Sequence, residues 1–122
     1  MNRAQQGALA YHAGLAAEEQ VAERYRRVGA DVSARRWRGR FGGEIDLIAR
    51  DGDVLIFVEV KRARTHAVAA ERLSMHQLRR IGIAAEEYAA LYAAGPGQKM
   101  RFDLALVDGA GRIEVIENAS MF

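Results

Sequence analysis

The sequence of 122 residues contains no cysteine and a single proline. Without cysteine the chain forms no disulfide, no thiolate metal site and no cysteine nucleophile, which is typical of a protein of the reducing cytoplasm. No run of about 18 or more apolar residues occurs, so the sequence predicts no transmembrane helix and no membrane association. The N-terminus also lacks the continuous apolar core of a signal peptide. We therefore expect a cytoplasmic protein.

An excess of one charge is also lacking, since the formal net charge is only +2. Half of the residues are hydrophobic, which is enough for one domain that spans residues 1–122. The arginines are nevertheless unevenly placed, and local clusters matter more than the total charge for binding a polyanion. We expect the following arginines to contact nucleic-acid phosphates: Arg35, Arg36, Arg38 and Arg40, and then Arg62 and Arg64. The alternative is a solvated edge strand, and for Trp37, which lies among them, we expect packing into the core.

The pattern of apolar residues predicts an α/β fold. The expected elements are a helix at residues 8–28, strands at 31–37, 44–50 and 54–61, a helix at 74–94 capped by Ser74, and strands at 101–107 and 112–116. Residues 62–72 show no clear periodicity, so a loop is expected there. The strand at 54–61 is apolar on both faces, as expected of a central strand covered by helices on each side. These elements form a mixed β-sheet of about five strands flanked by helices.

Charged residues stand at alternating positions of the two strands at 44–50 and 54–61, and they are Glu44 and Asp46 in the first and Glu59 and Lys61 in the second. Asp51-Gly52, which joins these strands, is a strong signal for a tight hairpin turn. If these two residues form the turn, Asp46 lies opposite Phe57, and Glu44 lies opposite Glu59. Residues two apart share one face of a strand, so the carboxylates gather on one patch. Like charges destabilise a bare sheet, and a cation between them would resolve this conflict.

Asp46 and Glu59, with Lys61 two positions further along, form the pattern D…E-x-K. Carboxylates are hard oxygen ligands that suit Mg²⁺, and a bound metal lowers the pKa of a water and offsets charge on a phosphate. A neighbouring lysine orients that water or stabilises the transition state. We interpret Asp46 and Glu59 as ligands of Mg²⁺ or Mn²⁺ and Lys61 as a catalytic residue. The alternative interpretation is a surface hairpin with solvated acids.

Two further polar residues lie in apolar helix stripes. Glu18 lies in the inner stripe of the first helix, where a charge needs a partner or a metal, unless the stripe is rotated and Glu18 is solvated. Gln77 continues the inner stripe of the second helix, where it would hydrogen-bond a phosphate or a water, unless it is a solvent-exposed residue at the helix start. Asp103 is expected to cap the strand or to pair with Arg101. The histidines lack ligand spacing and are expected to be structural or solvent-exposed.

The chain resembles the YraN-like uncharacterised protein family, placed in the PD-(D/E)XK restriction-endonuclease-like superfamily. The segments that carry the resemblance are residues 14–25, 42–52, 58–64, 73–81 and 101–108. The resemblance implies a restriction-endonuclease-like fold. It also implies metal-binding acids at Asp46 and Glu59, the superfamily's lysine at Lys61 and the acidic residue of the first helix at Glu18. Gln77 stands where relatives often carry lysine, and Arg36 stands where asparagine is usual.

We therefore expect a metal-dependent endonuclease that hydrolyses phosphodiester bonds in nucleic acid, with DNA favoured over RNA. Fold membership alone does not establish activity, and two other interpretations stay open. One is a nucleic-acid-binding module without catalysis. The other is a protein-interaction subunit of a DNA-processing assembly. One small domain offers little surface for specificity, so a second copy of the chain or a protein partner is also considered.

Overall fold

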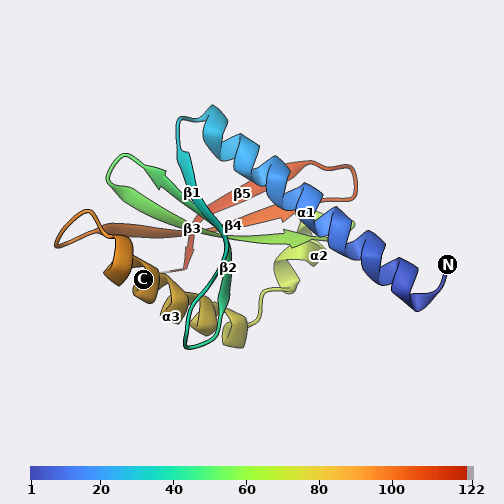
Figure 1. The fold of residues 1–122 in the computed structure, drawn as a ribbon. Coiled ribbons are helices and arrows are strands. Elements are labelled where there is room, and N and C mark those ends of the chain that lie inside the picture. The colour runs from blue at the N-terminus through green and yellow to red at the C-terminus, as the bar shows by residue number, and fades with distance from the viewer. Residues whose placement is uncertain (121–122) are drawn as a thin grey trace.

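The structure is a computed structural model that describes residues 1–120, and it contains a five-stranded sheet with helices on both faces (Figure 1). The elements are α1 (Arg3–Arg27), β1 (Asp31–Arg38), β2 (Glu44–Asp51), β3 (Val54–Arg62), α2 (His66–Glu71), α3 (Met75–Tyr92), β4 (Lys99–Val107) and β5 (Ile113–Ser120). The expected fold class is confirmed. None of the described helices is long and apolar enough to cross a membrane.

The strands follow the chain order β1-β2-β3-β4-β5. Only β3 and β4 run parallel, and the chain between them passes through α2 and α3, while the other neighbours are antiparallel. The expectation of a central strand with both faces covered is confirmed for β3. Phe57 belongs to the core beneath α3, and its neighbour Val58 belongs to the core beneath α1.

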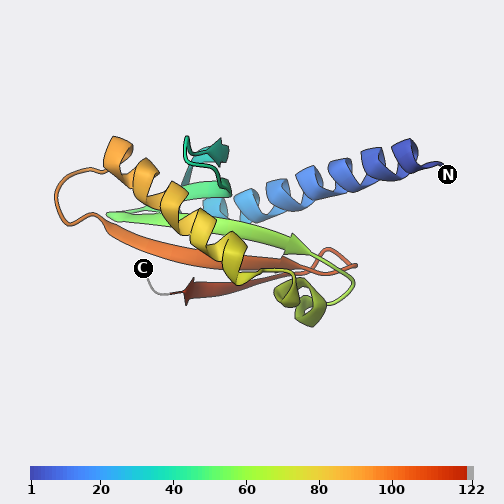
Figure 2. The ribbon, with the colours of Figure 1, turned by 90° about the horizontal axis from the view of Figure 1, so that it is seen from below.

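Helix α1 starts five residues earlier than the pattern predicted. Asn2 accepts a hydrogen bond from the Gln5 amide, and the Gln5 side chain bonds back to the Asn2 amide, which forms a capping box. Every buried residue of α1 lies at Ala17 or beyond, so the N-terminal half extends past the sheet (Figure 2). The helix ends at Arg27, one residue before the predicted end, and Gly29 just beyond it has a φ of +92°.

The β2–β3 hairpin differs in register from the prediction. Asp51 pairs with Val54, so the turn consists of Gly52 and Asp53 and not of Asp51-Gly52. Gly52 occupies the first central position with a φ of +60°, which is the requirement of a type II′ turn. The predicted pairs, Asp46 opposite Phe57 and Glu44 opposite Glu59, were therefore wrong by two residues. A shift of two preserves the face to which each side chain points.

The segment at residues 62–72, predicted as a loop, contains the short helix α2. Thr65 caps it, because the Thr65 hydroxyl accepts a hydrogen bond from the Val68 amide at 3.2 Å. Six residues are too few for a helical period to be visible in the sequence. The predicted cap of α3 is confirmed, since the Ser74 hydroxyl accepts from the Gln77 amide at 3.0 Å.

A buried polar cluster ties α1 to β4 and β5. Asp103 is fully buried, and it accepts hydrogen bonds from the Tyr25 hydroxyl at 2.6 Å and from the Arg101 guanidinium at 2.8 and 2.9 Å. The Asn118 amide donates a further bond at 3.0 Å. The predicted pairing of Asp103 with Arg101 is confirmed. Because every oxygen of the buried carboxylate has donors, this cluster is a structural feature of the core.

Candidate active site

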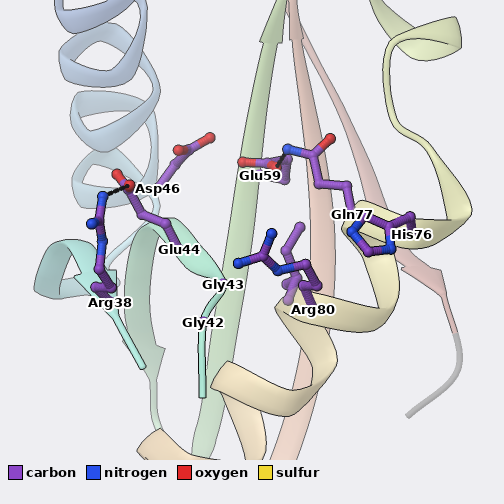
Figure 3. Close-up of a pocket in the computed structure, with 10 residues that line it drawn as sticks. Arg38, Gly42, Gly43, Glu44, Asp46, Glu59, His76, Gln77 and Arg80 are labelled. Carbon is purple, nitrogen blue, oxygen red and sulfur yellow. Dashed lines mark hydrogen bonds and ion pairs between the residues drawn. The ribbon is translucent and has the colours of Figure 1, made fainter. Parts of the chain in front are cut away.

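A cavity of about 500 Å³ opens between β2, β3 and α3 (Figure 3). It collects residues from distant parts of the chain, including three carboxylates. The lining residues are Arg38, Gly42, Gly43, Glu44, Asp46, Glu59, His76, Gln77, Arg80 and Ile81. Three residues predicted for the site, Asp46, Glu59 and Gln77, therefore share one concave surface.

The cavity lies where β2 and β3 stop pairing. Their ladder runs from the turn to Leu47 opposite Val58, and beyond this pair no further partners occur between these two strands. Asp46 is the next residue of β2, and its Oδ2 atom accepts a hydrogen bond from the Val60 amide at 2.8 Å. A side-chain carboxylate thus replaces the main-chain acceptor, which lets the strands separate without leaving the amide unpaired. The separation creates the space in which the carboxylates lie.

An irregularity of β2 accompanies this separation. Ile45 and Ile48 both belong to the core beneath α3, although they are three residues apart. Regular alternation would place them on opposite faces, so β2 is irregular between them. On the neighbouring strand Arg36 has a φ of +47°, an uncommon value for a residue other than glycine. The irregularity of both strands at this point directs Asp46 into the cavity.

Glu59 is the most buried carboxylate of the cavity, with an exposed fraction of 3%. The Gln77 side chain donates a hydrogen bond from Nε2 to Glu59 Oε2 at 2.7 Å, and Lys61 Nζ lies 3.8 Å from the same oxygen. Glu59 lies near the end of the apolar strand β3, so the core fixes its backbone. Gln77 lies in the first turn of α3, which Ser74 caps. Both members of this hydrogen bond therefore come from rigid elements.

Burial raises the pKa of Glu59 to about 9, and the neighbouring Asp46 carboxyl adds to this rise, while Lys61 opposes it. A divalent cation beside these carboxylates would offset this cost and favour the ionised form of Glu59. The donor set therefore fits a hard, oxygen-seeking cation. Within residues 1–120 no group of three or more His, Cys, Asp or Glu side chains is arranged to hold one ion.

Glu18 lies outside the cavity lining. Its carboxylate accepts two hydrogen bonds from Arg36, at 3.0 and 3.1 Å, and its side chain is largely buried. The partner that a charge in an apolar stripe requires is therefore Arg36. The Arg36 guanidinium also lies over the ring of Tyr11, 5.4 Å from its centre. Glu18 remains close enough to Glu59 for its charge to contribute to the raised pKa of that residue.

The first predicted arginine cluster is largely paired with carboxylates. Besides Arg36, the ion pairs join Arg35 to Glu19, Arg38 to Glu44 at 3.2 Å, and Arg40 to Glu87 at 3.0 Å. The side chains of these four arginines are one-third or more exposed, so they stay accessible to solvent. Trp37 packs against the core, with its ring 5.3 Å from that of Tyr88, as predicted.

Arg62 and Arg64, at the end of β3, differ from the first cluster. Their side chains are exposed and form no ion pair with any residue in the described part of the chain. Arg62 directly follows Lys61 and Arg64 lies two residues after the end of the strand, so both are at the same end of β3 as the carboxylate of Glu59. Among the predicted arginines, these two are the cations whose charge is not offset by a carboxylate partner.

Sequence reasoning missed five lining residues, which are Gly42, Gly43, His76, Arg80 and Ile81. Both glycines have positive φ values, +88° and +83°, and they form the turn before β2. Arg80 follows Gln77 by three residues on α3, and residues with this spacing share one face of a helix. The spacing from Gln77 is therefore a signal by which Arg80 could have been found.

The fold and the cavity define a mixed α/β protein with a two-carboxylate site at the point where two strands separate. The family model described as "Uncharacterised protein family UPF0102" matches residues 17–107. The chain belongs to this family.

The similarity of this chain to relatives in the family extends over nearly its whole length. A UPF0102 protein of Cereibacter sphaeroides is 56% identical over 113 residues, which are 93% of this chain and 96% of the relative. A UPF0102 protein of Ruegeria pomeroyi is 52% identical and covers 95% of this chain and 94% of its own length. A third, from Dinoroseobacter shibae, is 48% identical and covers 98% and 88%.

Proposed function

We propose that this protein is a metal-dependent phosphodiesterase that acts on nucleic acid, most simply as an endonuclease. The observation that carries the proposal is the buried Glu59 carboxylate beside Asp46 at the base of an open cavity, with Lys61 next to it. Burying the Glu59 carboxyl group beside a second carboxyl group costs free energy, which a bound cation would offset. The arrangement also fits the PD-(D/E)XK superfamily, to which the sequence resemblance pointed.

Asp46 and Glu59 would hold a divalent cation, Mg²⁺ or Mn²⁺. When bound, the ion would supply a water of lowered pKa and would offset charge on the phosphate. With only two protein carboxylates, the remaining ligands would be waters and phosphate oxygens, which is how Mg²⁺ is usually held in proteins.

The neighbouring residues keep these carboxylates in place. Gln77 fixes the orientation of Glu59 through its hydrogen bond at 2.7 Å. The Val60 amide fixes one oxygen of Asp46 at 2.8 Å and leaves the other oxygen available for a ligand. Lys61 places a positive charge 3.8 Å from Glu59, where it would stabilise negative charge on a phosphate. Glu18, held by Arg36, would support the site through its charge without lining the cavity.

Nucleic acid is the proposed substrate because phosphates need cations outside the metal site. Arg62 and Arg64 are exposed and without carboxylate partners among the described residues, so their charge is available to a polyanion. Arg35, Arg36, Arg38 and Arg40 would contribute only by exchanging their carboxylate partners for phosphate. Binding through such contacts weakens steeply as salt concentration rises.

The test is cleavage of labelled single-stranded, duplex and branched DNA, and of RNA, with Mg²⁺, with Mn²⁺ and with EDTA. The variants are Glu59→Gln and Lys61→Ala, and the matched control is Lys99→Ala, which removes an exposed lysine at the start of β4. We expect cleavage that requires metal, that is lost in both site variants and that is retained in the control. Equal cleavage by all four proteins would identify a contaminating nuclease and refute the proposal.

Binding without cleavage by the wild type would instead identify a nucleic-acid-binding module. Absence of both binding and cleavage at moderate salt would exclude nucleic acid as the substrate. A protein partner retained in pull-downs would then support the role of an interaction subunit.

A further inference from the structure

Arg80 is a cation of the cavity that has no carboxylate partner among residues 1–120. Its guanidinium points into the cavity, between the Gly42–Gly43 turn and Gln77 (Figure 3). Three carboxylates line the same cavity, yet none of the described residues forms an ion pair or a side-chain hydrogen bond with Arg80. An arginine that lines a cavity and pairs with none of its carboxylates is available to bind an anion.

The turn before β2 is shaped around this arginine. A Cβ atom on Gly42 would lie 2.6 Å from Nη2 of Arg80, which is closer than non-bonded atoms approach. A Cβ atom on Gly43 would lie 2.5 Å from the main-chain oxygen of Arg80. Both glycines also have positive φ values, which residues with a side chain rarely adopt. The turn thus contacts both the backbone and the guanidinium of Arg80, and it leaves the guanidinium free to meet a ligand.

Arg38, the other arginine that lines the cavity, has a carboxylate partner. Arg38 donates to Glu44 at 3.2 Å, so the charges of these two lining residues offset one another. Within the part of the chain that the structure describes, the Arg80 guanidinium is therefore the unpaired one near Asp46 and Glu59, and Lys61 lies beside Glu59. The carboxylates would hold a cation, and the arginine would bind an anion. A ligand that contacts both the bound cation and the guanidinium would therefore fit this cavity. A phosphate group is such a ligand, because its oxygens bind both metal ions and guanidinium groups.

We propose that Arg80 binds the non-bridging oxygens of the phosphodiester that enters this cavity. The proposal rests on the proposed function and adds to it the residue that positions the substrate's phosphate. A guanidinium presents two parallel N–H donors to a phosphate, which lysine does not. Arg80 therefore recognises the phosphate group itself and reads no base sequence.

The test measures the binding of fluorescein-labelled single-stranded and duplex DNA, and of RNA, by fluorescence anisotropy at several salt concentrations. Wild type is compared with Arg80→Ala and Arg80→Lys. The matched control is Arg79→Ala, because Arg79 is the preceding residue of α3, is exposed and does not line the cavity. Binding is measured with Ca²⁺ or EDTA so that cleavage does not interfere. Thermal unfolding of each variant verifies that the fold is intact.

We expect Arg80→Ala to weaken binding by roughly ten- to a hundredfold, the usual effect of losing a charge-assisted hydrogen bond. The slope of log affinity against log salt should decrease by about one, as for the loss of one phosphate contact. Arg80→Lys should recover part of the affinity, because it restores the charge but not the paired donors. Arg79→Ala should stay within about threefold of wild type. Equal effects of Arg80→Ala and Arg79→Ala would overturn the proposal.

The two proposals fail in different ways. Metal-dependent cleavage that is lost in Glu59→Gln but unaffected in Arg80→Ala, with unchanged binding, would refute the role of Arg80 alone. Binding that depends on Arg80, without cleavage in any metal, would refute the nuclease and retain the phosphate contact. Absence of nucleic-acid binding by the wild type would refute both.

Discussion

Replacing Gly43 by alanine tests how tightly the turn before β2 packs against α3. At this position φ is +83°, and a Cβ atom would lie 2.5 Å from the main-chain oxygen of Arg80 and 3.1 Å from its carbonyl carbon. The left-handed backbone costs an alanine about 1–2 kcal/mol. Overlap with a helix backbone, which cannot move aside like a flexible side chain, adds about 1–3 kcal/mol. We expect Gly43→Ala to lower the free energy of unfolding by about 2–5 kcal/mol.

The matched control is Gly52→Ala in the β2–β3 turn. Gly52 also has a positive φ, +60°, but a Cβ atom there would meet nothing within 4 Å. This variant therefore measures the cost of the left-handed backbone alone, and it should lower the free energy of unfolding by about 1–2 kcal/mol. Urea unfolding monitored by circular dichroism measures both variants. Equal losses in the two would refute the close contact between the turn and α3 on which the position of Arg80 depends.

Three further predictions concern other parts of the molecule. Gly14→Ala in α1 places a methyl group in open space and should stabilise the protein by about 0.5–1 kcal/mol in urea unfolding. Tyr25→Phe removes one donor from the buried Asp103 carboxylate, and it should lower the free energy of unfolding by about 1–3 kcal/mol in the same assay. Without metal, folded Glu59 keeps a proton that the unfolded chain releases above its ordinary pKa of 4.5, so stability should fall as pH rises from about 4.5 to about 9. In EDTA, the free energy of unfolding should depend steeply on pH across this range for wild type and less steeply for Glu59→Gln. Parallel curves for the two proteins would contradict the assignment of this proton to Glu59.

The sequence was sufficient for the fold because its signals were local and mutually consistent. The apolar run of β3 and the cap at Ser74 each predicted an element that the structure contains. The register of the β2–β3 hairpin was not predictable in the same way. Gly52 satisfies a tight turn from either central position, and the choice between them moves the pairing by two residues. An error of two residues leaves unchanged the face that regular alternation predicts, and Asp46 and Glu59 line one cavity in the structure.

The candidate site was predictable only where strand geometry determines it. Asp46 and Glu59 reach one cavity because they lie on neighbouring strands, whereas the partner of Glu18 depends on the packing of α1 against β1. Arg36 holds Glu18 from a left-handed backbone conformation, which asparagine, the residue usual there by resemblance, adopts more readily. In the sequence, Arg80 differs from Arg79 only by its spacing of three residues from Gln77, which places Arg80 and Gln77 on one face of α3.

The hydrogen bond from the Val60 amide to Asp46 makes the main chain of β3 a reporter of the cavity. This amide donates to a carboxylate oxygen where a strand would normally supply a carbonyl. Any cation that draws electron density from Asp46 also weakens the acceptor that this amide sees. The nitrogen and proton resonances of Val60 should therefore shift as metal is added, even in a variant such as Lys61→Ala that is designed not to turn over substrate. Occupancy of the site can in this way be followed by NMR independently of catalysis.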